Sequence, residues 1–138
     1  MPDSYKGYTI KHPSDIVALT KRYSTKRQEH FLVITLNGEH STIKKHIATI
    51  GLANKTIVHP REIFWWAIKD NALAVVLVHN HPSGCIKPSP QDNEATEQLC
   101  KAGKILGIRV LDHVIITKED YYSYRQHELI SDDGEFGL

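Results

Sequence analysis

The feature of the sequence that most constrains the fold is the apolar run LAVVLVH at residues 73–79. The run is short, uninterrupted and rich in valine, and the segments on either side of it carry apolar residues at helical spacing. Such a run is typical of a strand that is buried on both faces of a sheet covered by helices. It therefore predicts an α/β fold with a central strand at this position.

The segments around this run predict alternating helices and strands. Helices are expected in DIVALTKRYS with Ser14 as its cap, in PREIFWWAIKDNA with Pro60 in the first turn, and in SPQDNEATEQLCKAGKILG, which ends near Gly107. Strands are expected in EHFLVITLNGEHSTIKKHIATI, a hairpin turning at Asn37 and Gly38, and in RVLDHVIIT and DYYSYRQ. The order indicates an α/β sandwich with a mixed sheet, and the tail SDDGEFGL is expected to be frayed.

Composition sets the class of protein. A chain of 138 residues with 41% apolar and 24% charged residues is typical of one globular domain. Its polar start, MPDSYKGYTIKHPSD, lacks the apolar core of a signal peptide, and no window is apolar enough to span a membrane. We therefore expect a cytoplasmic protein in which Cys85 and Cys100 are free thiols.

Two histidines stand where the central strand ends. In an extended segment residues i and i+2 point to the same side, so His79 and His81 project together while Asn80 points away. Asp92 follows after ten intervening residues, in the first turn of the next expected helix. Two neutral imidazoles and one carboxylate suit zinc, and three protein ligands leave a fourth tetrahedral position for water. The spacing is compatible with a catalytic zinc site.

The same segment also fits a structural interpretation that needs no metal. Ser89 as the cap, Pro90 at the first position and Asp92 at the third position would together begin a helix. A pair of histidines after a strand is often exposed in a loop. That interpretation leaves His79 and His81 without partners at the end of a buried strand, so spacing alone leaves both interpretations open.

The motif H-x-H-P, followed by a serine and then by an aspartate, resembles the JAMM, or MPN-plus, metalloprotease motif. The stretches VHPREIFWWAIKDNALAVVLVHNHPSGCIKPSPQD, GIRVLDHVII and YYSYR resemble the RadC group of bacterial JAB-domain proteins. The resemblance covers a core of about 8–130 within one expected domain of residues 1–138. Longer members of the group carry an amino-terminal helix-hairpin-helix region, which is not expected here because fewer than thirty residues precede Glu29. The resemblance also implies a cytidine-deaminase-like JAB (MPN) fold, in which helices sandwich a mixed sheet.

The resemblance further implies which residues carry the chemistry. It places one zinc ion per chain on His79, His81 and Asp92. Glu29, at the start of the first hairpin strand, corresponds to the catalytic base, whereas without the motif it would be interpreted as an exposed charge. Ser89 corresponds to the motif serine, whose hydroxyl can accept a capping hydrogen bond and donate another to an oxyanion.

Several residues near the motif have other expected roles. Cys85 stands where the RadC pattern more often has an acidic residue, and its thiol could become a fourth ligand that closes the open position. His113 is interpreted as a strand histidine satisfied by hydrogen bonds, and Asp112 as a packing residue or a neighbour of the site. Trp65 and Trp66 are expected to supply helix packing, with an exposed contact surface as the alternative for one of them.

These features predict a zinc-dependent metallopeptidase or isopeptidase that acts on a protein or peptide substrate. The alternative is a DNA-repair-associated RadC-like protein, either a nuclease or a non-catalytic module of a DNA-processing complex. A net charge of +1 does not support nucleic-acid binding, because Lys and Arg supply most of the non-specific affinity for phosphates. A scaffold without activity is a third interpretation, and the complete Glu-His-His-Asp set argues against it. The sequence specifies neither the natural substrate nor the oligomeric state.

Overall fold

The structure is a computed structural model that describes residues 7–51 and 58–137. At its centre lies a five-stranded sheet with the order β2-β1-β3-β4-β5. β3 and β4 pair in parallel, and the other neighbours pair antiparallel, so the sheet is mixed as predicted. The strands are β1 (Glu29–Leu36), β2 (Thr42–Gly51), β3 (Ala74–Asn80), β4 (Arg109–Ile116) and β5 (Tyr121–Ser123).

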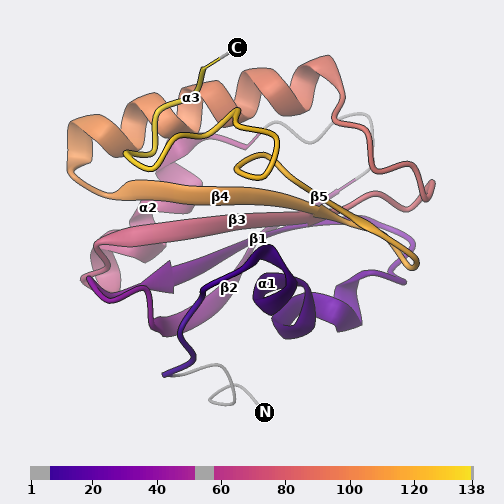
Figure 1. Cartoon of the computed structure of the whole chain (residues 1–138), viewed down its shortest axis with the longest axis horizontal. Coiled ribbons are helices and arrows are strands. Elements are labelled where there is room, and N and C mark those ends of the chain that lie inside the picture. The colour runs from indigo at the N-terminus through magenta and orange to yellow at the C-terminus, as the bar shows by residue number, and fades with distance from the viewer. Residues whose placement is uncertain (1–6, 52–57, 138) are drawn as a thin grey trace.

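Helices cover both faces of the sheet (Figure 1). α1 (Pro13–Thr20) and the short 3-10 helix η2 (Lys21–Tyr23) pack on one face, and α2 (Pro60–Lys69) and α3 (Pro90–Leu106) pack on the other. Each face has its own hydrophobic core, because successive residues of a strand point to opposite sides. The predicted α/β sandwich is therefore confirmed.

The central strand confirms the interpretation of LAVVLVH. All seven residues of β3 are buried, and the strand pairs with β1 on one side and β4 on the other. Val75 and Leu77 point into the core under α2 and α3, and Val76 and Val78 point into the core under α1. The polar residues that follow β3 consequently emerge between two flanking strands.

The expected beginnings of α2 and α3 are confirmed. Pro60 and Pro90 occupy first-turn positions, and Ser89 caps α3. α3 ends at Gly107, whose φ of 74° is left-handed and therefore suits glycine. The expected cap of α1 is wrong, because α1 begins at Pro13 after His12, and the side chain of Asp15 accepts a hydrogen bond from the His12 N–H at 3.0 Å.

Two loop regions also differ from expectation. The hairpin connection spans residues 37–41 instead of a two-residue turn, and the Asn37 side chain accepts hydrogen bonds from the N–H groups of Glu39 and Ser41. The tail is not frayed over residues 131–137. Ser131 donates its N–H to the Glu135 carbonyl, and Phe136 packs against the α2/α3 core, so tertiary contacts order a segment whose polarity predicted fraying.

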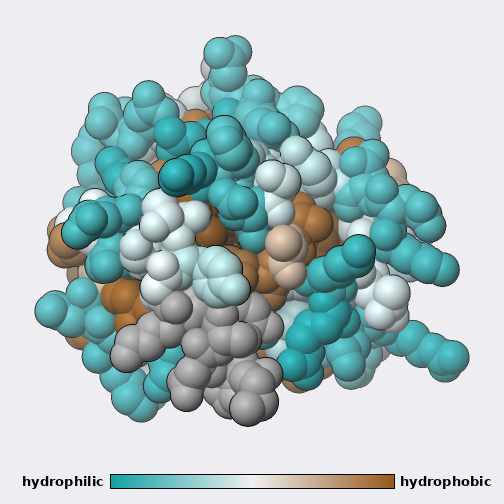
Figure 2. Space-filling model, turned by 60° about the horizontal axis from the view of Figure 1, so that its bottom comes forward, coloured by the Kyte–Doolittle hydropathy of each residue, from teal (hydrophilic) through white to brown (hydrophobic). Residues whose placement is uncertain are grey.

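The outer surface is largely hydrophilic, with apolar side chains interspersed, on the face shown in Figure 2. Trp66 packs against the core as expected, whereas Trp65 is 55% exposed. None of the described helices has the length and hydrophobicity of a membrane-spanning segment.

Candidate metal centre

Three polar residues, His79, Asn80 and His81, stand where β3 ends, and their side chains point alternately to the two faces of the sheet. His79 shares the α2/α3 face with Leu77, and it is 1% exposed. The chain continues alongside β4 beyond the last residue of β3, because the His81 N–H donates to the Ile116 carbonyl at 3.0 Å. This extended course brings His79 and His81 to one side, as the strand period predicts.

Asp92 reaches the two histidines from the first turn of α3. The N–H of Ser89 donates to Asp92 Oδ2 at 2.8 Å, and the N–H of Asp92 donates to Ser89 Oγ at 3.0 Å. This reciprocal capping box holds the carboxylate in one orientation. Helix capping and approach to the histidines, which the sequence presents as alternatives, therefore occur together.

The side chains of His79, His81 and Asp92 converge closely. His79 Nε2 lies 3.0 Å from His81 Nε2 and 3.3 Å from Asp92 Oδ1, and His81 Nε2 lies 3.1 Å from Asp92 Oδ2. Among residues 7–51 and 58–137, these three form a group that could hold a metal ion, with ligand atoms within 4.8 Å of one another. We call them the His-His-Asp cluster.

The donors and acceptors of the cluster fit a cation. His81 Nδ1 lies 2.7 Å from the Cys85 carbonyl oxygen, which can only accept, so this nitrogen carries the proton. A neutral His81 therefore presents a bare lone pair at Nε2 to the Asp92 carboxylate, and this contact is favourable only when a proton or a metal ion lies between the two acceptors. Burial alone would lower the pKa of His81, but the hydrogen bond and charge of Asp92 outweigh burial and raise it. Zinc favours the same donor set.

Glu29 lies beside the cluster as the first residue of β1. Since Phe31 pairs with His79, the alternation of β1 places Glu29 on the same face as His79. Its Oε1 lies 3.9 Å from His79 Nε2, and the residue is 5% exposed. Burial raises the pKa of Glu29 to about 7, and the charge of Asp92 contributes to the rise. A carboxyl group with this pKa can exchange a proton near neutral pH.

Asn80 points to the opposite face of the sheet, as predicted, and is fully buried there. Its Oδ1 accepts a hydrogen bond from the His30 N–H at 2.6 Å, and its Nδ2 donates to the carbonyls of Lys26 and Gln28. These bonds tie the segment around Glu29 to the strand that carries the histidines. The sequence predicted that Asn80 points away from the two histidines, but it did not indicate these partners.

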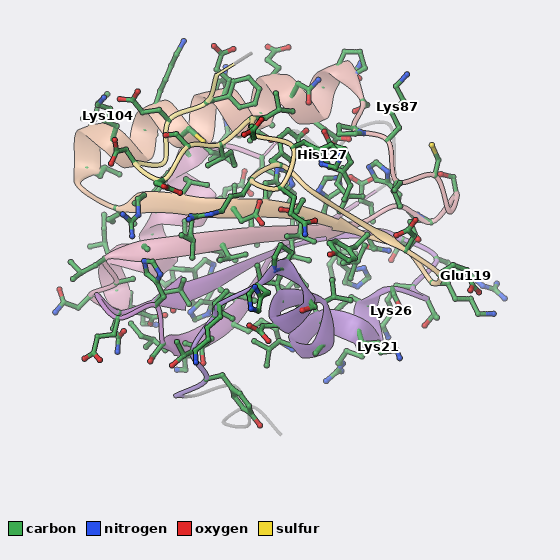
Figure 3. The ribbon with its side chains drawn as sticks, viewed as in Figure 1. Lys21, Lys26, Lys87, Lys104, Glu119 and His127 are labelled. Atoms are coloured by element: carbon green, nitrogen blue, oxygen red, sulfur yellow. The ribbon has the colours of Figure 1, made fainter. Side chains whose placement is uncertain are left out.

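A pocket of about 240 Å³ opens onto the cluster, and Glu29, His81, Ser89 and Asp92 contribute to its walls. Cys85 also lines the pocket, but its thiol does not belong to the group of close ligand atoms among the described residues. Its carbonyl oxygen orients His81 instead. Figure 3 shows Lys87, another lining residue, at the same end of the molecule as Lys26 and Glu119, and opposite Lys104.

Two residues of β4 complete the surroundings. His113 is fully buried and contacts His79, so the expectation of a hydrogen-bonded strand histidine agrees with the structure. Asp112 points away from the cluster and accepts hydrogen bonds from the Ser123 hydroxyl and from the main-chain N–H of Arg125. It therefore links β4 to the segment around β5.

A helix-covered mixed sheet that presents two histidines at the end of its central strand, with an aspartate from the next helix, is the arrangement of a JAB-type domain. The family model of the RadC-like JAB domain matches residues 10–129, so the chain belongs to this family.

Relatives named "UPF0758 protein" support this membership. The relative from Methanospirillum hungatei is 49% identical over 126 residues, which are 90% of this chain and 56% of that protein. The relative from Rubrobacter xylanophilus is 42% identical over 122 residues, covering 88% of this chain and 53% of that protein. The relative from Alkaliphilus metalliredigens is 44% identical over 124 residues, covering 89% of this chain and 53% of that protein. The chain thus spans about half the length of these curated relatives.

Proposed function

We propose that this domain is a zinc-dependent hydrolase of the JAMM type that cleaves amide bonds in a protein or peptide substrate. The observation that carries the proposal is the convergence of His79, His81 and Asp92 beside a buried glutamate, at a pocket that His81, Asp92 and the glutamate line. When bound, zinc would supply Lewis acidity, which polarises a carbonyl and makes a nearby water acidic. The two imidazoles and the carboxylate would hold it.

Glu29 is assigned the proton transfers. Its carboxylate reaches the same pocket without belonging to the close ligand group, so it is placed to act on water and substrate. With a pKa raised to about 7, Oε1 or Oε2 can take a proton from the attacking water and later deliver it to the departing amine.

Ser89 is assigned to the oxyanion that develops on the attacked carbonyl. Its Oγ accepts from the Asp92 N–H, which leaves the hydroxyl hydrogen available for donation. Loss of one oxyanion donor typically lowers turnover by about 10² to 10³. We expect Ser89→Ala to show this loss in turnover while it retains metal.

The test compares the full chain with Glu29→Gln, using zinc content and cleavage of a defined peptide mixture. Glu29→Gln should keep its zinc and lose about 10²- to 10⁴-fold in hydrolysis rate. Glu119→Gln is the matched control, because it makes the same substitution at an exposed glutamate at the same end of the molecule. It should behave as the native chain does.

Three outcomes would overturn parts of this proposal. If Glu29→Gln loses the metal, Glu29 is a ligand and its role as base is wrong. If Glu29→Gln hydrolyses peptides at the native rate, the base lies elsewhere. Metal-dependent nicking of plasmid DNA that disappears in Glu29→Gln, without peptide cleavage by the native chain, would favour the nuclease alternative.

A further inference from the structure

His113 occupies an unusual place behind the His-His-Asp cluster. It lies in β4, 0% exposed, with its ring stacked on Tyr124 at 5.0 Å and tilted against Phe31 at 5.4 Å. Both ring nitrogens contact polar atoms. Nε2 lies 2.7 Å from His79 Nδ1, and Nδ1 lies 2.6 Å from Thr96 Oγ1. His113 therefore connects a cluster residue to α3.

The direction of these hydrogen bonds follows from Thr96. Its hydroxyl is 2.7 Å from the main-chain carbonyl of Asp92, one helical turn earlier, and a carbonyl can only accept. The single hydroxyl hydrogen is therefore used in that bond. Thr96 Oγ1 must then accept from His113, so the proton of His113 lies on Nδ1.

The state of His79 follows from that of His113. The His113 nitrogens contact a neutral hydroxyl and another imidazole, so a charge on this buried ring would lack a counter-ion in contact, and burial of such a charge is costly. A neutral His113 with its proton on Nδ1 has a lone pair on Nε2. That lone pair accepts from His79 Nδ1–H, and His79 Nε2 is left bare toward His81 and Asp92.

We propose that Thr96 and His113 are positioning residues that fix the tautomer of His79, so that its Nε2 lone pair faces the cluster. The inference rests on the proposed function in that this lone pair would bind the metal. His81 obtains the same orientation from the Cys85 carbonyl. The chain of bonds begins at the Asp92 carbonyl and ends at His79, so it couples two of the three cluster residues.

Loss of this chain of bonds should weaken metal binding without removing a ligand. A free neutral imidazole can carry its proton on either nitrogen, and the tautomer with Nε2–H presents a hydrogen to the cluster in place of a lone pair. Groups that orient a metal-bound histidine typically contribute about 10- to 100-fold in metal affinity. Thr96→Val removes the hydroxyl at nearly constant volume, and Thr96→Ser keeps the hydroxyl.

The test uses the full chain and two measurements. Nitrogen-15 NMR of the metal-free native chain should show His79 protonated at Nδ1, and zinc titration should give about 10- to 100-fold weaker affinity for Thr96→Val, with Thr96→Ser close to native. Thr20→Val is the matched control, because Thr20 is also 0% exposed and donates to a carbonyl one turn earlier, at 2.8 Å, but lies on α1. It should leave both measurements unchanged.

The results separate this inference from the proposed function. A metal-free native chain with the His79 proton on Nε2 would overturn the inference without any variant. Native zinc affinity in a folded Thr96→Val would also overturn it, and the proposed hydrolase would still stand. If the tautomer is as expected and shifts in Thr96→Val, but the native chain does not bind zinc, the inference about tautomers stands and the proposed function fails.

Discussion

Two polar clusters, each partly buried, lie on the α2/α3 face of the sheet, one toward each end. The His-His-Asp cluster lies beyond the carboxyl end of β3, beside the start of β1. The second, which we call the His46 cluster, consists of Thr35, His46 and Asp70 and lies toward the other end of β1. Both clusters combine histidine with aspartate, but they differ in whether hydrogen-bond donors or acceptors face the carboxylate.

The His46 cluster satisfies itself. Asp70 Oδ2 accepts from the Thr35 hydroxyl at 2.7 Å and from His46 Nε2 at 2.6 Å, so one carboxylate meets two donors. The His46 ring stacks on Trp66 with centroids 3.9 Å apart. Asp70 caps the carboxyl end of α2, so the cluster fastens this helix to β1 and β2. The Asp70 carboxylate therefore meets hydrogen-bond donors without a ligand.

In the His-His-Asp cluster, in contrast, neutral histidines direct lone pairs at the Asp92 carboxylate, and a proton or a metal ion must bridge them. The nitrogens and the carboxylate that face each other have their remaining partners elsewhere, at the Cys85 carbonyl, at His113 and at the N–H of Ser89. The difference shows that a partly buried pair of histidine and aspartate is not by itself a reason to expect a metal site. An excess of inward-facing lone pairs is the more specific indication.

The largest expected effect that tests this comparison is the change in zinc-dependent stability when the aspartate of each cluster is replaced by asparagine. Zinc at a thousandfold excess over its Kd should stabilise the native chain by about 4.1 kcal/mol. Asp92→Asn should lose most of this increment, because it weakens an anionic ligand. Asp70→Asn should keep the increment. The measurement is urea unfolding at fixed free zinc and again with chelator.

The opposite pattern would break the comparison. An Asp70→Asn variant that no longer responds to zinc would make the His46 cluster the metal site. An Asp92→Asn variant with the full native increment would show that the carboxylate is not needed to hold the ion.

The next effect concerns the stability that the His46 cluster provides without metal. Hydrogen bonds to a charged group contribute about 1.5–3 kcal/mol, so Asp70→Asn should lower the free energy of unfolding by this amount at neutral pH. Asp132→Asn is the control, because its ion pair with Arg125 is exposed and such pairs contribute only about 0–1 kcal/mol.

The contribution of Asp70 to stability should also depend on pH, in a direction that follows from its pKa. Burial alone would raise the pKa of Asp70, but the hydrogen bonds from His46 and Thr35 outweigh burial and lower it. A carboxyl whose folded pKa is lowered stabilises the fold above its unfolded pKa, and this contribution is lost as pH falls through the folded pKa. Asp70→Asn should therefore remove part of the acid sensitivity in urea unfolding measured from neutral pH downward. If the free energy of unfolding of Asp70→Asn falls with decreasing pH as steeply as that of the native chain, this assignment is wrong.

The sequence predicted the parts of the site that depend on local patterns, namely the two-residue alternation of a strand and the cap of a helix. The strand period brought His79 and His81 together, and the capping pattern S-P-x-D brought Asp92 to the first turn of α3. The mixed sheet also followed from local patterns, because a valine-rich run between helices has few other solutions. Glu29 required the family resemblance, since its own surroundings predicted an exposed charge.

The remaining parts depend on contacts between distant segments. His113 is separated by 34 residues from His79, and Asn80 by 50 residues or more from the main-chain atoms that it binds. No local pattern encodes such pairs. The prediction of a frayed tail over residues 131–137 was wrong for the same reason, because Phe136 packs against the distant α2/α3 core. The predicted cap of α1 was wrong for a local reason, because Pro13 and the Asp15 side chain begin the helix after His12.

The smallest expected effect comes from removing a threonine hydroxyl near each cluster, Thr35 in the His46 cluster and Thr96 behind the His-His-Asp cluster. Thr35→Val removes one donor to Asp70 and should cost about 0.5–1.5 kcal/mol in unfolding free energy, with zinc affinity unchanged. Thr35 is paired with Val75, four residues from His79 along β3, which corresponds to about 13 Å. Thr96 shares no hydrogen-bond partner with Thr35. Substitutions at distant sites without shared partners add within about 0.3–0.5 kcal/mol, so Thr35→Val and Thr96→Val should be independent in unfolding experiments. Thr35→Val and Asp70→Asn should instead couple by about 0.5–3 kcal/mol, because they remove the same bond. Strong coupling between the two threonines would mean that the clusters form one network, and the distinction between the His46 cluster and the proposed metal-binding cluster would fail.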